Sequence, residues 1–458
     1  MAGIGFRLQR YFVEGNVLGF IQGACYSVII STGPWLITIL AISLVSIYAQ
    51  TRINIHDLYI FKSMICYTYA SSLVLFGLIE MPLTRYIADQ IYKDDYTTFK
   101  SVFVTVVSFF ILLTPLLAGS FYSSFNEFST LTKLSGMLFF ASVLVIWPAM
   151  IFLSAAKNFH QIIFSFLWGA GASALLSIQL GKHYELPGYI LGYAMGQMLL
   201  AIGLASNVMH EFKTTDYFSL DFLSYFSKHK ILVAVGLFYY LGIWSDKVIF
   251  WFGPEGEKIL HLFYTNHYYD TAMFLAYLSI VPSLAIFLVQ VETNFAKRYF
   301  FYFQAIEKKN NLNVINENVN DIVISVREGL YRLFRIQTLI TFLLWYFAEK
   351  ILGSLYFPAI MTSIFKYGII GAYMQSLFVS INIMLLYFLQ HKKVFIHYLL
   401  FFLLNTGLSL VTSRLDYRYY GLGYLISTFI TLLLSFFALN HILKKLNFYT
   451  FMGQPIYA

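Results

Sequence analysis

Two adjacent charged residues, Asp246 and Lys247, lie in an otherwise apolar stretch of the sequence. A charge within a hydrophobic layer is costly unless it faces water or a partner, so both residues are candidates for function. In a helix, Trp244, Lys247 and Trp251 share one face, and Tyr239 and Asp246 share a neighbouring face. We expect this group to line a substrate path. The alternative for Lys247 is that its long side chain reaches out to the membrane interface.

A proline interrupts the first apolar stretch, in the triplet Gly33-Pro34-Trp35. Pro34 has no N–H to donate to the carbonyl of Ile30, so a helix here is predicted to kink and to leave a backbone acceptor unused. Pro34 and Trp35 are therefore candidates for a gating hinge or a substrate contact. A kink that serves packing alone is the other interpretation.

Two carboxylates occupy matching places at the ends of apolar stretches. Glu80 is followed five residues later by Arg85, and Glu292 by Lys297 at the same interval. A five-residue step turns a helix by about 140°, so the base is poorly placed to neutralise the acid on its own helix. Partners on other helices, forming a cytoplasmic gate of ion pairs, are the functional hypothesis. Ordinary boundary charges at a helix end are the alternative.

The elements that must position these residues are membrane-spanning helices. Of the 458 residues, 59% are hydrophobic and 11% are charged, which excludes water as the solvent for most of the surface. A helix needs about 20 apolar residues to cross roughly 30 Å of hydrocarbon, and inside lipid every backbone polar group must bond internally. The predicted fold is thus all-α, with about twelve spans. They are 21–48, 58–83, 102–121, 138–155, 162–180, 189–209, 231–252, 271–291, 336–357, 370–389, 394–411 and 422–443.

The basic residues predict the orientation of these spans. Most of the 30 Lys and Arg fall in connections that share a side with both ends of the chain. By the positive-inside rule both termini are cytoplasmic, and the net charge of +8 is no sign of nucleic-acid binding. The predicted domains are a cytoplasmic segment 1–20, a six-helix bundle 21–210, a linker 211–230, a second bundle 231–445 with a cytoplasmic loop 294–335, and a tail 446–458.

The cytoplasmic loop is predicted to hold two helical stretches that flank an Asn-rich turn, 310–320. Arg327, Arg332 and Arg335 in its second stretch indicate contact with lipid headgroups or with an acidic partner. A solvated connector is the alternative interpretation.

Three matches in the same order indicate that the two sets of six spans are repeats. Gly33-Pro34-Trp35 matches Gly242-Ile243-Trp244, the Glu80 segment matches the Glu292 segment, and Leu191-Gly192-Tyr193 matches Leu422-Gly423-Tyr424. Halves of six spans enter the membrane from the same side, which gives parallel repeats related about the membrane normal. That geometry suits alternating access.

Several enzyme classes are disfavoured by what the sequence lacks. There is no Walker A sequence for ATP hydrolysis, and no D-x-D pair for a nucleotide sugar. We therefore predict no catalytic residues, no cofactor and no metal site, and a protein that is not an enzyme.

Eight segments from one end of the chain to the other resemble the PelG family of exopolysaccharide transporters. They are 1–6 (MAGIGF), 33–35 (GPW), 84–89 (TRYIAD), 242–251 (GIWSDKVIFW), 269–270 (YD), 274–282 (FLAYLSIVP), 291–296 (VETNFA) and 449–452 (YTFM). The resemblance implies the superfamily of multidrug and toxin extruders (MATE), polysaccharide flippases and lipid II flippases (MOP), with two six-helix bundles around a central cavity.

The resemblance also implies a function and partners. We expect export of the Pel polysaccharide, an amino-sugar polymer of the biofilm matrix, across the cytoplasmic (inner) membrane of a bacterium. The implied partners, besides the lipid bilayer and the polysaccharide, are a cytosolic glycosyltransferase (PelF-like) and membrane subunits (PelD-like and PelE-like). Two alternatives stay open: a flippase for lipid-linked oligosaccharides, and a membrane scaffold that anchors the glycosyltransferase.

Overall fold

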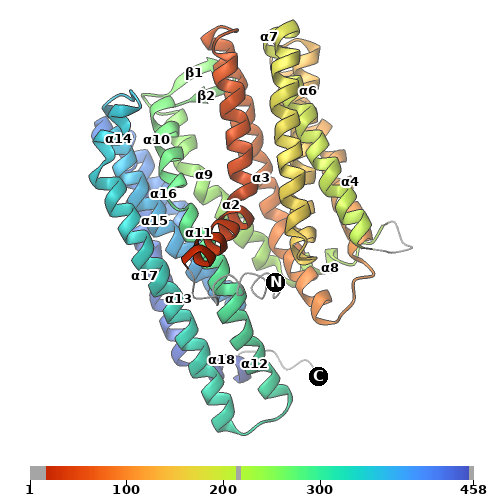
Figure 1. Cartoon of the computed structure of the whole chain (residues 1–458), viewed down its shortest axis with the longest axis vertical. Coiled ribbons are helices and arrows are strands. Elements are labelled where there is room, and N and C mark those ends of the chain that lie inside the picture. Colours follow the sequence, from red (N-terminus) through yellow and green to blue (C-terminus); the bar gives the residue numbers. More distant parts are fainter. Residues whose placement is uncertain (1–16, 213–217, 453–458) are drawn as a thin grey trace. The chain divides into compact units, whose positions relative to one another are not determined.

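The computed structural model describes residues 17–212 and 218–452, with side chains from residue 32 onward except at 289, 292 and 293. The described chain is almost entirely helical (Figure 1). Within it, ten helices are long and apolar enough to cross a membrane. The predicted fold class, an all-α integral membrane protein, is confirmed.

The chain forms two compact units. We call Gly33–Leu241 with Gly256–Thr265 the N-terminal unit. The C-terminal unit comprises the described residues of Met1–Thr32, Gly242–Glu255 and Asn266–Ala458. Two helices, α2 (Val17–Ala49) and α9 (Lys230–Trp251), therefore contribute residues to both units. The predicted domain boundaries at 210 and 231 stay a prediction.

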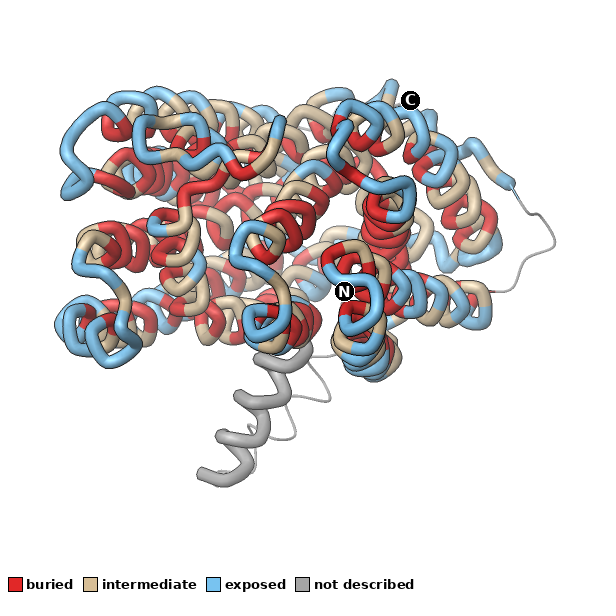
Figure 2. The backbone as a smooth tube through the Cα atoms, turned by 90° about the horizontal axis from the view of Figure 1, so that it is seen from above, coloured by how far each residue is buried: buried red, intermediate tan, exposed pale blue. Residues whose placement is uncertain are grey.

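The N-terminal unit is built from long helices with short connections. Its further helices are α3 (Ile55–Tyr92), α4 (Phe99–Thr114), a π-helical turn (Pro115–Gly119), α5 (Ser120–Ser123), α6 (Thr130–Ala155), α7 (Phe159–Glu211) and α8 (Leu223–Lys228). Buried residues gather on the sides where neighbouring helices face one another, and exposed residues on the outer sides (Figure 2). The predicted linker 211–230 thus contains a short helix, α8.

Helix α7 holds two predicted spans, 162–180 and 189–209, folded against each other. Its helical path breaks at Glu185, where φ is 52° and ψ is −136°. Residues on either side of the break then pair: the Ser177 hydroxyl donates to the carbonyl of Tyr189 at 3.0 Å, and Gln197 Nε2 donates to Ser173 Oγ at 3.0 Å. One of the ten candidate helices of the described chain therefore holds two predicted spans.

The C-terminal unit has the remaining helices. They are α10 (His267–Leu278), α11 (Val281–Gln290), a π-helical turn (Val291–Phe295), α12 (Ala296–Glu307), α13 (Leu312–Tyr346), α14 (Ala348–Ser354), α15 (Ile360–Tyr387), α16 (His391–Thr412), a 3-10 turn (Tyr417–Tyr419), α17 (Leu422–Lys444) and α18 (Leu446–Met452). The predicted tail therefore begins with a helix, and Tyr302 of α12 donates a hydrogen bond to Asn447 of α18 at 3.0 Å.

The predicted ninth span, 336–357, is not one continuous helix. Helix α13 ends at Tyr346. At its other side, Gln337 Nε2 donates to the carbonyl of Ser279 at 3.0 Å, and Gln290 Nε2 donates to the carbonyl of Ser325 at 3.2 Å. Helix α13 therefore runs beside α10 and α11 from Ser325 onward, before residue 336. Arginines in that stretch lower its hydropathy, and α13 is not among the ten candidate membrane helices of the described chain.

The predicted Asn-rich turn is also wrong. Helix α12 ends at Glu307 and α13 begins at Leu312, so the connection is only a few residues long. Asn311 is the N-cap, and its side chain accepts a hydrogen bond from the Val314 N–H at 3.0 Å. Asn310 also lies in the connection, whereas Asn313, Asn316, Asn318 and Asn320 lie in the first turns of α13. An asparagine run signals a turn only where its side chains cap the backbone, which here happens at Asn311.

A β-hairpin that the sequence reading missed joins α9 to α10. Strands β1 (Glu257–Leu260) and β2 (Phe263–Thr265) pair antiparallel and belong to the N-terminal unit. Phe263 is fully buried against Phe125, with ring centroids 4.9 Å apart. Tyr67 Oη donates to the Tyr264 carbonyl and accepts from the Tyr264 N–H, both at 3.0 Å. The strands are too short for a period-two pattern to stand out.

The two Leu-Gly-Tyr copies occupy equivalent packing positions. A Cβ on Gly192 would lie 2.4 Å from the carbonyl of Leu176 in the preceding segment of α7. A Cβ on Gly423 of α17 would lie 2.7 Å from the carbonyl carbon of Leu408 in α16. In each unit the glycine lets two consecutive helices approach backbone to backbone. The repeat inferred from sequence is thus matched by the same contact in both units.

Candidate substrate-path site

Asp246 is the centre of a buried polar network in the C-terminal unit. Its side chain is fully buried on α9. One carboxylate oxygen accepts from Tyr269 Oη of α10 at 2.7 Å, and the other accepts from Asn405 Nδ2 of α16 at 3.3 Å. Asn405 Nδ2 also donates to the carbonyl of Gly242 at 2.9 Å. A buried carboxylate needs such donors, and two helices distant in sequence, α10 and α16, supply them.

Lys247 is the counter-charge of Asp246, and its side chain is slightly more exposed than that of Asp246. Its Nζ lies 3.3 Å from both carboxylate oxygens, 3.0 Å from the Ile243 carbonyl and 3.3 Å from the Tyr277 hydroxyl. The Lys247 side chain is 12% exposed, whereas that of Asp246 is 0% exposed. The ammonium also lies 4.8 Å from the ring centroid of Tyr277 and 5.9 Å from that of Trp244, within the range of cation–π attraction.

The two tryptophans of α9 differ in their hydrogen bonds. Trp251 donates its indole N–H to both carboxylate oxygens of Asp270, at 3.0 and 2.8 Å. The indole nitrogen of Trp244 is also buried, but it has no acceptor among the described residues. The rings lie 6.3 Å apart, and Trp244 is partly exposed. The predicted shared face of Trp244, Lys247 and Trp251 is present, and it carries one unused donor.

Residues that were not predicted from the sequence as part of the site extend this network. Tyr277 Oη donates to Gln375 Oε1 of α15 at 3.4 Å, and Tyr424 of α17 donates to the same oxygen. Together with Tyr269 and Asn405 they form the polar interior of the unit. In the sequence, these residues stand out only as polar side chains within apolar stretches. Many residues with that pattern serve packing alone, so it does not identify a site.

Tyr239, Pro34 and Trp35 belong to the N-terminal unit. Tyr239 packs on Tyr240, with ring centroids 5.0 Å apart. Pro34 is buried within a continuous helix α2, and the Thr38 hydroxyl donates to the Pro34 carbonyl at 2.9 Å. Trp35 is 40% exposed. The structure thus places these three in one unit and Trp244, Asp246, Lys247 and Trp251 in the other.

The four residues of the predicted gate are distributed in the same way. In the N-terminal unit, Glu80 has the Tyr240 side chain of α9 as a hydrogen-bond partner, and its Oε2 atom is buried with no hydrogen-bond partner among the described residues. Arg85 pairs with Asp89 one turn on, at 3.0 Å. In the C-terminal unit, Glu292 lies in a π-helical turn and its side chain is outside the described residues. Lys297 Nζ lies 5.8 Å from the ring centroid of Phe301.

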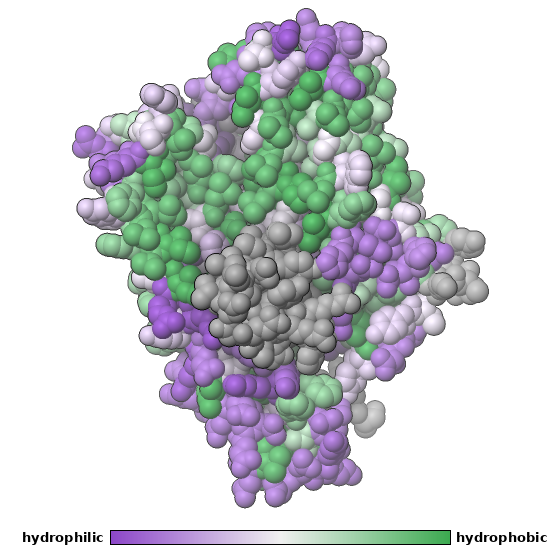
Figure 3. All heavy atoms as spheres, viewed as in Figure 1, coloured by the Kyte–Doolittle hydropathy of each residue, from purple (hydrophilic) through white to green (hydrophobic). Residues whose placement is uncertain are grey.

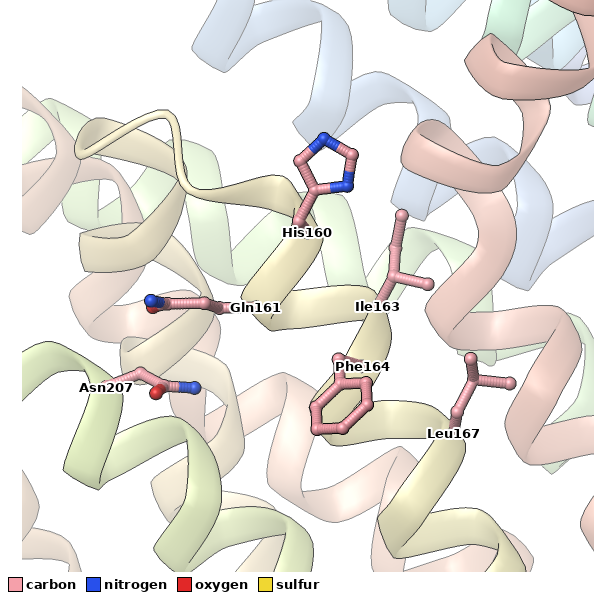
Figure 4. A pocket seen from close by; sticks show the side chains of 6 residues that line it. All are labelled: His160, Gln161, Ile163, Phe164, Leu167 and Asn207. Atoms are coloured by element: carbon pink, nitrogen blue, oxygen red, sulfur yellow. The ribbon is translucent and has the colours of Figure 1, made fainter.

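A surface pocket on the N-terminal unit involves none of the predicted residues. It encloses about 460 Å³ and is lined by His160, Gln161, Ile163, Phe164, Leu167 and Asn207 of α7 (Figure 4). Its wide opening and largely apolar lining suit contact with an acyl chain better than capture of a polar ligand. Across the described parts of the chain, no three His, Cys, Asp or Glu side chains group in a way that could hold a metal ion.

Solved structures of membrane transporters share the fold of this chain. An outward-facing MATE multidrug transporter of the MOP superfamily aligns with a TM-score of 0.66 and 11% identity, over 98% of this chain and 99% of its own. An inward-facing MATE multidrug transporter of the MOP superfamily aligns with a TM-score of 0.60 and 12% identity, over 89% of this chain and 95% of its own. A MOP-superfamily transporter from Pyrococcus furiosus aligns with a TM-score of 0.64 and 11% identity, over 92% of this chain and 96% of its own. The fold is that of MATE transporters in the MOP superfamily.

The family follows from a match over residues 1–451. The chain belongs to the PelG exopolysaccharide exporter (EPS-E) family. No curated protein sequence matches the chain. Family and fold together make it a multi-pass membrane transporter.

Proposed function

We propose that this protein exports an exopolysaccharide of the Pel type, an amino-sugar polymer for the biofilm matrix, across the cytoplasmic membrane of a bacterium, without catalysing a reaction itself. Membership in the exporter family and the transporter fold support export in general. The polymer class is our inference, and it rests on the chemistry of the site in the C-terminal unit.

The observation that carries the proposal is the unused indole donor of Trp244 beside Lys247. Neutral, N-acetylated sugars present carbonyl and hydroxyl oxygens together with apolar C–H faces. An aromatic ring with a free N–H can stack on such a face and donate to such an oxygen. Because the charge of Lys247 is already balanced by Asp246, the site favours a neutral ring over an anionic group.

We propose alternating access as the mechanism. The boundary between the compact units falls at Gly33 in α2 and at Gly242 in α9, the first residues of the matched triplets Gly33-Pro34-Trp35 and Gly242-Ile243-Trp244. Glycine tolerates backbone changes that other residues resist, so both helices have a natural pivot there. Glu80, Arg85, Glu292 and Lys297 are our candidates for a gate at the cytoplasmic side.

The protein is proposed to work with a cytosolic glycosyltransferase (PelF-like) and membrane subunits (PelD-like and PelE-like), which would deliver the polymer as it is made. A flippase for lipid-linked oligosaccharides and a scaffold for the glycosyltransferase are the competing functions. Each makes a different prediction in the following experiment.

The experiment compares two conservative variants on the same helix. Trp244→Phe removes an N–H that has no acceptor among the described residues, so we expect unchanged thermal stability and reduced polymer secretion by cells that carry the other export subunits. Trp251→Phe removes the N–H held by Asp270, and leaving that partly buried carboxylate short of a donor should cost about 1 kcal/mol of stability.

Full secretion by a well-folded Trp244→Phe variant would contradict the proposed contact. A scaffold is indicated if Asp246→Ala abolishes assembly of the complex, whereas a transporter is indicated if the complex stays intact and secretion stops. A flippase is indicated if lipid-linked units accumulate inside the cell.

A further inference from the structure

Two arginines of α13 lie beside a candidate membrane span. Arg332 and Arg335 fall between Ser325 and Gln337, the stretch of α13 that runs beside α10 and α11. The neighbouring segment, His267–Leu288, is a candidate membrane span. Both arginines therefore stand beside the apolar layer, although the sequence alone had assigned them to a cytoplasmic loop.

Both arginines are exposed and lack acidic partners. Arg332 and Arg335 are exposed on the C-terminal unit, and neither is paired with an acidic side chain among the described residues. An unpaired guanidinium at this depth is costly, so it needs an anionic partner from outside the chain or a path to the interface.

The surrounding helix face is one that lipid would cover. Tyr331 is 64% exposed, and farther along the helix Leu339 and Phe342 are 60% and 59% exposed. Tyr331, Arg335, Leu339 and Phe342 follow one another at helical spacing on one face. The end of the unit formed by α12 and the start of α13 is mainly hydrophilic in Figure 3, so α13 passes from a polar to an apolar environment.

Arg335 bends toward the polar end of the helix. Its guanidinium carbon lies 5.8 Å from the ring centroid of Tyr331, one turn nearer the start of α13. By the positive-inside rule that end is cytoplasmic. A long basic side chain that turns from an apolar face toward the headgroups is snorkelling, and tyrosine is a usual companion at that level.

We propose that Arg332, Arg335 and Tyr331 hold the phosphate of an anionic phospholipid in the cytoplasmic leaflet, while its acyl chains lie along Leu339 and Phe342. Guanidinium groups donate to phosphate in a bidentate manner, which fits two arginines less than one helical turn apart. The site is independent of the proposed sugar contact at Trp244, which lies on another helix.

The test titrates the purified full-length chain in detergent with phosphatidylglycerol, phosphatidylcholine or inorganic phosphate and counts bound ligand by native mass spectrometry. We expect phosphatidylglycerol to bind most tightly. Arg332→Gln and Arg335→Gln should each weaken it about fivefold, and Arg335→Lys much less. Arg414→Gln, which removes an exposed arginine elsewhere on the chain, is the matched control and should have no effect.

Three outcomes would overturn the proposal. If the unmodified chain binds phosphatidylglycerol and phosphatidylcholine with equal affinity, the arginines do not select an anionic lipid. Equally tight binding of inorganic phosphate assigns the site to a soluble ligand. An effect of Arg414→Gln as large as that of Arg335→Gln shows a general response to charge.

Discussion

The pairing of Asp246 with Lys247 makes a quantitative prediction about stability. Lys247→Met leaves a carboxylate that is 0% exposed with only the Tyr269 and Asn405 donors, at 2.7 and 3.3 Å. Removing one partner of a buried pair costs about 3–5 kcal/mol. Asp246→Asn should cost about 3 kcal/mol of stability, the lower limit of that range. The cost is smaller because Lys247 keeps its hydrogen bond to the Ile243 carbonyl and some contact with solvent.

The double variant, Asp246→Asn with Lys247→Met, buries no charge at this place. We expect its loss of stability to be smaller than the sum of the single losses by about 2 kcal/mol, as for residues in direct contact. The assay is reversible unfolding in mixed micelles followed by tryptophan fluorescence, with all four proteins compared at the same detergent composition. Additive losses would refute the reasoning, since they would show that the two charges do not depend on each other.

Three further predictions concern packing and pH. Gly192→Ala and Gly423→Ala should each lose about 1–3 kcal/mol of stability through backbone overlap, whereas Gly171→Ala and Gly407→Ala, which meet no atom within 4 Å, should gain up to about 1 kcal/mol. Thermal unfolding of the four variants checks this, and equal effects at all four sites would contradict the packing described. Phe263→Ala should cost about 3–5 kcal/mol because the ring is fully buried, while Leu262→Ala, 43% exposed, should change stability by less than about 0.5 kcal/mol. If the two variants unfold alike, the hairpin is not anchored by Phe263. Lys366 hydrogen-bonds to Glu349 at 2.8 Å and holds the pKa of that carboxyl below its usual range, so its stabilising effect is present above the unfolded pKa and is lost as the pH falls through the folded one. Between about pH 5 and pH 3 the unmodified chain should therefore lose slightly more stability than Glu349→Gln, and identical pH profiles would count against the pair.

The fold class could be predicted because each span is a local signal. Apolar length and the distribution of Lys and Arg need no knowledge of the partner helices. Span boundaries were less certain where polar residues enter the layer, as Arg332 and Arg335 do in α13. Their side chains are compatible with membrane depth only because they lie on an exposed face, and that depends on neighbours distant in sequence.

The candidate site could be predicted only in part. Spacing placed Trp244, Lys247 and Trp251 on one face, and the ring contacts agree. Spacing cannot tell which indole N–H is already used, because the acceptor of Trp251 comes from another helix, α10. For the same reason Asn405 and Gln375, which hold the network from α16 and α15, gave no signal beyond their polarity.

The central claim, that this chain moves a polysaccharide across the membrane, is tested most directly in sealed inverted vesicles. They would contain the purified complex and receive nucleotide sugar on the outside, with and without a membrane potential. We expect polymer inside the lumen with the unmodified chain. With Trp244→Phe, we expect much less polymer in the lumen while polymer synthesis continues. Polymer that stays outside with the unmodified chain, or enters the lumen equally well when this chain is left out, would contradict it.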